Sequence, residues 1–514
     1  MILNRREFLN ISSLLALSSL IHQERSASQT PQPNIVIVLF DAWSAKNISL
    51  YGYQRETTPH LTRLAERAIV FHKHYASAPW TIPGTASLLT GTHPWTHRAF
   101  TITENQTIKG LVDKNVFAQS HGGGYFTDGY SHNPYANLFL YQFGKYLDRH
   151  TPLKDLFLKS PLFPISLLPK DPDAAALTLK NIFFNEDNVF SSLFLSGLLK
   201  PFSEERIDQL TKKYADAYPK GIPSIAGPEY FYRLEDSIDF ILDSLRSNPK
   251  PFLGYYHLYP PHAPYSPRKE FVGKFDDGWE APPKPDSIFS GGNSAAKISR
   301  ARRNYDEFVA YVDAEFARLY DELEKSGQLA NTWIILTSDH GEMFERGIIG
   351  HETTVAYEPV IHIPLIIFPP GQEARVDIYT STSAVDIFPT LLELLGLPNP
   401  STLEGESLFP FGKAAPDPNR SIFAFHPGHS TSSKPLSEGT AAIIKNGYKL
   451  IYSFGFENLG QEDSLVELYD INNDPEELDN LYSSEKKLAG DLYDELVSVM
   501  EQADQEYTLD ARQS

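Results

Sequence analysis

The sequence contains no cysteine among its 514 residues, which excludes disulfide bonds, thiolate metal ligands and a cysteine nucleophile. It also has no block of basic residues. Its 45 Lys and Arg are outnumbered by 65 Asp and Glu, which gives a net charge of −20. Such a chain repels nucleic acid and anionic membranes, so neither is an expected partner. After the N-terminal segment no stretch reaches the roughly 18 apolar residues of a membrane span, which predicts a soluble mature protein.

The N-terminal segment has the pattern of an export signal. Residues 4–9, NRREFL, carry an arginine pair ahead of a mildly apolar run from Ile11 to Ile21, and Ser26-Ala27-Ser28 offers small residues for cleavage. The pattern resembles a twin-arginine signal, with an ordinary secretory signal or an uncleaved anchor as alternatives. We therefore expect residues 1–28 to engage the twin-arginine export machinery, which carries folded proteins, and the mature protein to be periplasmic.

Residues 75–93, YASAPWTIPGTASLLTGTH, predict a helix that begins beside a hydroxyl group. Pro83 suits the first helical position because its φ is fixed and its missing N–H is not needed there, and Gly91 can end the helix with a left-handed cap. Thr81 is then held at the helix N-terminus, where free N–H groups and the helix dipole favour an anionic ester group. A hydroxyl in this place can attack phosphorus or sulfur.

Two apolar runs of strand length are each followed by acidic or imidazole side chains. The run IVIVLF at 35–40 precedes Asp41, and WIILT at 333–337 precedes Asp339 and His340. Continuous apolar runs are typical of buried parallel strands, and ligands bind beyond the carboxyl ends of such strands. Two carboxylates and an imidazole suit Mn²⁺ or Zn²⁺, and Ca²⁺ less well. A metal that touched Thr81 would lower the pKa of its hydroxyl.

Other segments complete the expected organisation. A helix is predicted over 58–70, and a further strand over 252–258 ends ahead of His262. Residues 150–202 form an irregular, Leu-, Phe- and Pro-rich insertion, whose apolar side chains cover the core or cap the site for an apolar substrate. From about residue 413, short strand-like segments followed by a helix predict a smaller antiparallel α+β subdomain over 413–514.

Six segments in order resemble the sulfatase family of the alkaline phosphatase superfamily. They are PNIVIVLFDAW, TTPHLTRLAERAIVFHKHYASAPWTIPGTASLLTG, YHLYPPHAPY, NTWIILTSDHGEMFERGIIGHE, VDIFPTLLELLG and ELYDINNDPEELDNL, and they extend from residue 33 to about 482. The resemblance implies an α/β fold with a doubly wound, mostly parallel sheet and helices on both faces, forming a catalytic domain over 33–412. It also implies an ester hydrolase site that holds one or two divalent metal ions.

The resemblance assigns roles residue by residue. Asp41, Asp339 and His340 match the metal ligands, and Thr81 matches the nucleophile that also touches the metal. His351 falls where the family has a His or Lys that contacts the ester or helps the leaving group depart, and His262 matches a residue that holds the substrate anion. His132 and Asn133 lie near a region where relatives place substrate-binding residues, and Thr85, at the position of the usual arginine, is a further candidate for substrate binding.

This chain departs from the family at the nucleophile. Sulfatases convert a Cys or Ser in a C/S-x-P-x-R pattern to formylglycine, whereas here the pattern reads Thr81-Ile82-Pro83-Gly84-Thr85. Because threonine carries a methyl group on Cβ, the same oxidation would give a ketone. Thr85 replaces the usual arginine, and Ala42 stands where many sulfatases have a second aspartate, which weakens the usual Ca²⁺ assignment.

Three functions follow from this pattern. The first is a metal-dependent hydrolase of sulfate or phosphate esters with Thr81 as nucleophile, acting on a small molecule or on an envelope glycan or lipid. The second is a transferase similar to the phosphoglycerol and phosphoethanolamine transferases, which use a threonine but usually carry membrane spans. The third is a non-catalytic homologue that binds anions. The sequence leaves the oligomeric state open.

Overall fold

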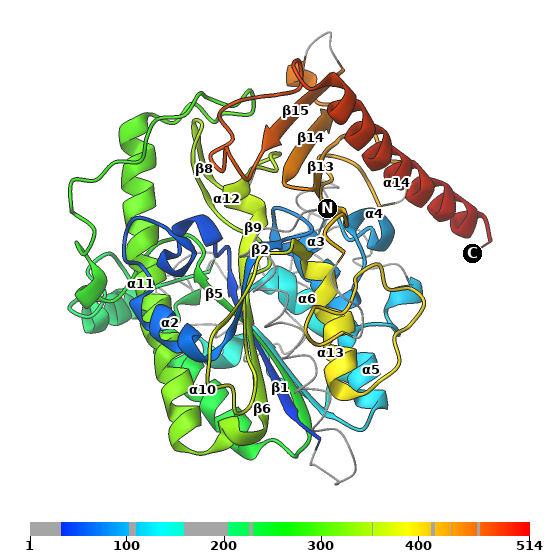
Figure 1. The fold of residues 1–514 in the computed structure, drawn as a ribbon. Coiled ribbons are helices and arrows are strands. Elements are labelled where there is room, and N and C mark those ends of the chain that lie inside the picture. Colours follow the sequence, from blue (N-terminus) through cyan, green and yellow to red (C-terminus); the bar gives the residue numbers. More distant parts are fainter. Residues whose placement is uncertain are drawn as a thin grey trace, which may run out of the picture.

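The computed structural model describes residues 32–101, 109–158, 204–225, 230–351, 353–412, 417–432, 434–459 and 463–513. The signal expected at residues 1–28 and most of the insertion expected at 150–202 lie outside these ranges. The described chain forms a large central sheet between helices, with a smaller sheet and a long C-terminal helix beside it (Figure 1).

The central sheet is built from the apolar runs seen in the sequence. β1 (Asn34–Asp41) lies between β5 (Phe252–Pro261) and β6 (Thr332–Thr337) and pairs with both in parallel. The described strands follow the order β10-β2-β9-β6-β1-β5-β3-β4, with β11 beside β2, and among them β9 (His362–Phe368) is antiparallel to its neighbours. The prediction of a mostly parallel sheet is confirmed. The other strands are β2 (Ile69–Tyr75), β3 (Phe126–Ser131), β4 (Arg149–His150), β10 (Val376–Ile378) and β11 (Thr382–Ser383).

Alternating side chains of β1 enter two separate cores, because successive residues of a strand point to opposite faces. Val36, Val38 and Phe40 pack with helices α2, α10 and α11. Ile35, Ile37 and Leu39 pack with α3, α5, α6 and α13 on the other face, so helices cover both faces as predicted (Figure 1). These helices are α2 (Pro59–Leu64), α3 (Thr81–Thr90), α5 (Val116–Gly122), α6 (Pro134–Gln142), α10 (Leu234–Ser247), α11 (Ala295–Lys325) and α13 (Ile387–Leu395).

Two helix predictions need correction. The helix expected over 58–70 ends earlier, because a 3₁₀ turn follows α2 and Ile69 already begins β2, where β-branched and aromatic residues fit between β9 and β10. In α3, Thr81 is the first helical residue and Pro83 the third. Pro83 is tolerated there because N–H groups of the first turn have no partner within the helix. Gly91 ends α3 in the left-handed conformation, φ +66°, as expected.

The C-terminal part forms the predicted smaller antiparallel sheet. Its strands are β12 (Ile422–His426), β13 (Gly439–Lys445), β14 (Tyr448–Phe454) and β15 (Ser464–Asp470), and they pair in this order. One face packs on α14 (Lys486–Gln513) and α4 (Pro94–His97). The other face packs on α12 (Glu358–Ile361) and on a hairpin formed by β7 (Met343–Glu345) and β8 (Ile348–Gly350). None of the described helices is long and apolar enough to cross a membrane.

Candidate functional site

Two buried carboxylates meet at the carboxyl ends of neighbouring strands. Asp41 is the last residue of β1 and Asp339 lies two residues beyond β6. Asp41 Oδ2 accepts hydrogen bonds from Asn133 Nδ2 at 2.5 Å and His257 Nε2 at 3.0 Å, whereas Oδ1 accepts none from the described residues. Asp339 Oδ1 accepts from the backbone N–H groups of Ala42 and His340 at 3.3 and 3.0 Å, and its Oδ2 accepts none from this part of the chain. Each carboxylate therefore keeps one oxygen bare.

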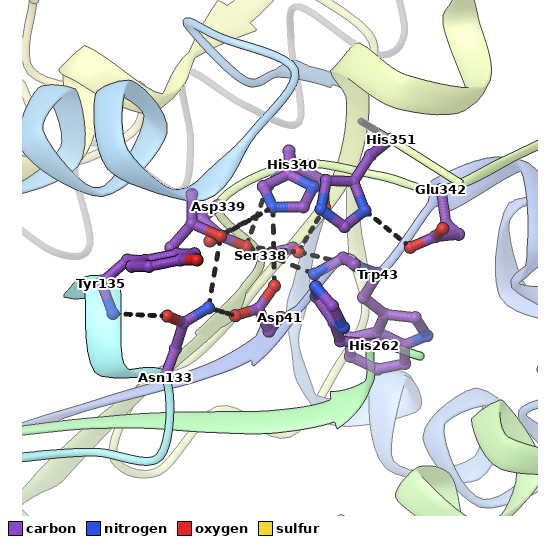
Figure 2. A network of polar contacts seen from close by, with 12 residues as sticks. Asp41, Trp43, Asn133, Tyr135, His262, Ser338, Asp339, His340, Glu342 and His351 are labelled. Atoms are coloured by element: carbon purple, nitrogen blue, oxygen red, sulfur yellow. Dashed lines mark hydrogen bonds and ion pairs between the residues drawn. The ribbon is translucent and has the colours of Figure 1, made fainter. Parts of the chain in front are cut away.

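His340 adds a nitrogen to these two bare oxygens. Its Nδ1–H donates a hydrogen bond to the carbonyl oxygen of Gly341 at 2.9 Å, and this tautomer leaves Nε2 with a lone pair. Nε2 lies 3.5 Å from Asp41 Oδ1 and 3.6 Å from Asp339 Oδ2. Figure 2 shows these side chains turned toward one another.

Thr81 borders this cluster from the first turn of α3. Its Oγ1 is 3.2 Å from His340 Nε2 and accepts from Asn133 Nδ2 at 3.3 Å. The close approach of α3 depends on Gly84, where a Cβ atom would lie 2.6 Å from the carbonyl oxygen of Asp339. The hydroxyl thus lies at a helix N-terminus, as the sequence predicted, and beside the group of potential metal ligands.

Electrostatics at the site favour a cation. Burial and the neighbouring Asp41 carboxylate raise the pKa of Asp339 well above its usual range. Burial also acts to raise the pKa of Asp41, but the His257 hydrogen bond and the nearby histidines hold that pKa below its usual range. Burial lowers the pKa of His340, so its ring is neutral and can act as a ligand. A cation bound between these two buried acids would therefore offset their negative charge.

The described residues fit a divalent metal ion. Asp41, Asp339 and His340 are all buried, and ligand atoms of the three lie within 4.8 Å of one another. Buried oxygens without hydrogen-bond partners are costly unless they coordinate an ion. The donor set of two carboxylates and one imidazole suits Mn²⁺ or Zn²⁺.

Two further histidines lie on one side of this candidate metal site. The ring centroid of His351 is 4.2 Å from that of His340 and 4.8 Å from that of His262. Glu342 precedes β7 and His351 follows β8, so the β7–β8 hairpin brings them together, and His351 Nδ1 donates to Glu342 Oε2 at 3.0 Å. His262 Nδ1 donates to the carbonyl of Ala263 at 2.7 Å. Burial lowers the pKa of His262.

The remaining predicted site residues lie in different surroundings. Asn133 joins Asp41 to Thr81 and so belongs to the cluster. His132 does not, because its buried ring packs against Tyr130 and Tyr232 and its Nε2 is 3.2 Å from Ser237 Oγ. Thr85 is buried one turn into α3, and its Oγ1 has no hydrogen-bond partner among the described residues.

Sequence reasoning missed His257 and Glu342. His257 lies inside an apolar strand, where a single histidine looks like a core residue. One signal was available, since it is the last but one residue of the strand expected over 252–258; in the structure it pairs with Leu39 of β1. Glu342 follows His340 after a single glycine in the sequence, but its contact with His351 is seen only in the structure, through the hairpin.

Family models match most of the chain. The model described as Sulfatase matches residues 33–397, and the model described as N-sulphoglucosamine sulphohydrolase, C-terminal, matches residues 350–506. The uncharacterized sulfatase YidJ of Escherichia coli is 24% identical over 483 residues, covering 88% of this chain and 83% of its own. Arylsulfatase K of Rattus norvegicus is 24% identical over 489 residues, covering 93% of this chain and 80% of its own.

Solved structures have the same fold. The phosphonate monoester hydrolase of Agrobacterium radiobacter matches with a TM-score of 0.64 and 20% identity, covering 92% of this chain and 96% of its own. A protein solved in complex with its substrate D-glucosamine-2-N,6-O-disulfate matches with a TM-score of 0.60 and 19% identity, covering 93% of this chain and 98% of its own. At these identities the likeness shows the fold.

Proposed function

The chain belongs to the sulfatase family and is a sulfuric or phosphoric ester hydrolase, and from this premise we propose that it works as a metal-dependent enzyme with unmodified Thr81 as its nucleophile. One observation carries the proposal: the Thr81 hydroxyl lies 3.2 Å from His340 Nε2, beside two bare carboxylate oxygens at a helix N-terminus. Asp41, Asp339 and His340 would hold the metal. When bound, a divalent ion lowers the pKa of the Thr81 hydroxyl and offsets the charge of the ester.

The chain's own residues then bind the ester and carry the protons. The N–H groups of the first turn of α3 attract the anionic group, and the Asn133 Nδ2–H stabilises the Thr81 oxygen as it becomes an alkoxide. The Thr81 hydroxyl first gives its proton to solvent water. Its Oγ1 then attacks phosphorus or sulfur, and the bond to the alcohol breaks. His351 gives a proton to the departing oxygen. Because the Nδ1–H of His262 already donates to the Ala263 carbonyl, His262 would hold the anion through Nε2–H when its ring is protonated.

The ester formed on Thr81 must then be hydrolysed by water. His351 takes one proton from the attacking water, the bond between Thr81 Oγ1 and phosphorus or sulfur breaks, and inorganic phosphate, a phosphonate or sulfate leaves. Threonine has no second hydroxyl group on its reacting carbon, so it cannot release the anion by reforming a carbonyl, as a hydrated aldehyde can.

Thr81 favours phosphoryl monoesters as substrates, because an alkoxide attacks phosphorus readily and the resulting phosphothreonine is cleaved by water. The fold shared with phosphonate monoester hydrolases is consistent with this choice. Sulfate esters are the second candidate, and the family match favours them. The organic part is a small molecule or an envelope glycan or lipid, in keeping with a structural neighbour solved with a sulfated sugar.

The test is hydrolysis by the purified protein, loaded in turn with Mn²⁺, Zn²⁺ and Ca²⁺, of matched aryl sulfate, phosphate monoester and phosphodiester substrates. We expect metal-dependent release of the aryl alcohol, fastest from the phosphate monoester. A faster reaction with the aryl sulfate would assign the sulfate class to the same nucleophile. Transfer of the group to an added alcohol in place of water would indicate a transferase, and no reaction with any substrate and metal would contradict the proposal.

A further inference from the structure

His257 contacts Oδ2 of Asp41, whereas Oδ1 is the oxygen that faces His340. We propose that His257 is a positioning residue that, together with Tyr255, fixes which oxygen of Asp41 faces the divalent ion and so sets the affinity of the site for that ion. The inference rests on the proposed function in one respect, namely that the site binds a divalent metal.

The two residues form a buried row along β5. Tyr255 and His257 are two residues apart, so their side chains point to the same face of the strand. Both are fully buried, and the Tyr255 hydroxyl is 3.2 Å from His257 Nδ1. On the other side of the ring, Nε2 is 3.0 Å from Asp41 Oδ2. The row therefore runs from a phenol through an imidazole to a carboxylate.

The positions of the protons in this row follow from its two ends. Burial raises the pKa of Tyr255 well above its usual value, so its hydroxyl keeps the proton. This hydroxyl donates to Nδ1, which places the imidazole hydrogen on Nε2 and points it at the Asp41 carboxylate. The opposite tautomer would set the lone pair of Nε2 against a carboxylate oxygen, which is unfavourable.

The hydrogen bond distinguishes between the two acids and between the two oxygens of Asp41. Nε2 of His257 is 3.7 Å from Asp339 Oδ2, too far for a good hydrogen bond, so it holds Asp41 alone. With His257 and Asn133 both donating to Oδ2, the Oδ1 atom of Asp41 is left to face His340. A carboxylate without these donors can rotate, and the site then loses part of its preorganisation toward a cation.

The test measures metal binding without substrate. The full chain is stripped with a chelator and titrated with Mn²⁺ by calorimetry, for the wild type and for His257→Phe, His257→Gln and Tyr255→Phe. Partners behind a metal ligand typically contribute about 10- to 100-fold in affinity, so His257→Phe should raise the Kd for Mn²⁺ by that factor. His257→Gln keeps an N–H near Nε2 and should restore most of the affinity, and Tyr255→Phe should weaken binding less than His257→Phe.

His74→Phe is the matched control. His74 is also a fully buried histidine of the central sheet, but its Nδ1 lies 2.9 Å from Thr382 Oγ1 and the ring contacts no carboxylate at the site. This variant should lose stability yet bind Mn²⁺ with the wild-type Kd. The electron paramagnetic resonance spectrum of bound Mn²⁺ should change in His257→Phe and not in His74→Phe.

The outcomes separate this inference from the proposed function. A wild type that binds none of Mn²⁺, Zn²⁺ and Ca²⁺ would overturn both. Wild-type binding together with an unchanged Kd in His257→Phe would overturn the inference alone. If His257→Phe does not fold, His257→Gln and Tyr255→Phe decide: wild-type affinity in Gln with weaker binding in Tyr255→Phe supports the inference, and wild-type affinity in both overturns it.

Discussion

Replacement of Thr81 by alanine is the perturbation that the site geometry predicts most sharply. Thr81 Oγ1 is buried and held between His340 Nε2 at 3.2 Å and Asn133 Nδ2 at 3.3 Å. A nucleophile oriented in this way has an effective concentration of about 10⁵–10⁸ M, against about 55 M for the water that would replace it. We therefore expect kcat/KM of Thr81→Ala to fall by roughly 10³- to 10⁶-fold, which corresponds to about 4–8 kcal/mol of transition-state stabilisation.

Thr81→Ser separates the hydroxyl from the methyl group. Serine keeps the nucleophile but loses the β-branch that restricts χ1, so the oxygen is held less firmly. The serine variant should remain active, within about 10- to 100-fold of the wild type, a loss we assign to this weaker positioning. Both variants should keep the wild-type melting temperature and much of the metal affinity, since Asp41, Asp339 and His340 are unchanged.

The assay combines steady-state rates with chemical trapping. Rapid acid quench during turnover, followed by mass spectrometry of the peptide that contains residue 81, should detect one phosphoryl or sulfo group on the wild type and on Thr81→Ser, and none on Thr81→Ala. A wild-type kcat/KM in Thr81→Ala would refute the nucleophile assignment. So would a group trapped on another residue of the wild type.

Two further predictions concern buried acids. Glu342 accepts a hydrogen bond from His351 Nδ1 at 3.0 Å. Glu342→Gln should therefore lower kcat/KM about 10-fold or more for alkyl esters, whose poor leaving groups need the proton of His351, and little for p-nitrophenyl esters. An equal loss for both kinds of ester would contradict this role. Burial raises the pKa of Asp313 from 3.8 to about 7, so the folded state binds the proton more tightly than the unfolded state. The stability that this group contributes therefore falls as the pH rises from the unfolded pKa to the folded pKa. Between pH 5 and pH 8, the free energy of unfolding of Asp313→Asn should therefore rise relative to that of the wild type by up to about 3 kcal/mol. Urea unfolding of both proteins at each pH measures this difference, and a difference that does not change with pH would refute the pKa shift.

Much of this molecule was predictable because its strands are apolar on both faces. The runs at 35–40 and 333–337 specify buried parallel strands, and the polar residues that follow them must lie at one edge of the sheet. This is why the sequence placed Asp41, Asp339 and His340 at one edge of the sheet, where the structure brings them together. The glycine and proline residues around Thr81 likewise indicated a helix start.

Tertiary structure decided which neighbours act together. His132 and Asn133 are adjacent in sequence, but adjacent side chains in extended backbone point to opposite sides, so Asn133 reaches Asp41 and Thr81 while His132 packs among aromatic rings. His257 reaches Asp41 only through the parallel register of β5 and β1.

The sequence by itself determined the chemical groups of this site: two carboxylates, an imidazole and a threonine hydroxyl at the ends of buried strands and at a helix start. The three-dimensional packing alone decided which oxygen of Asp41 and of Asp339 stays bare and which nitrogen of His340 carries the lone pair. The physical reason is that hydrogen-bond partners come from residues far apart in the chain, such as Asn133 and His257 for Asp41, and no local pattern specifies such pairs.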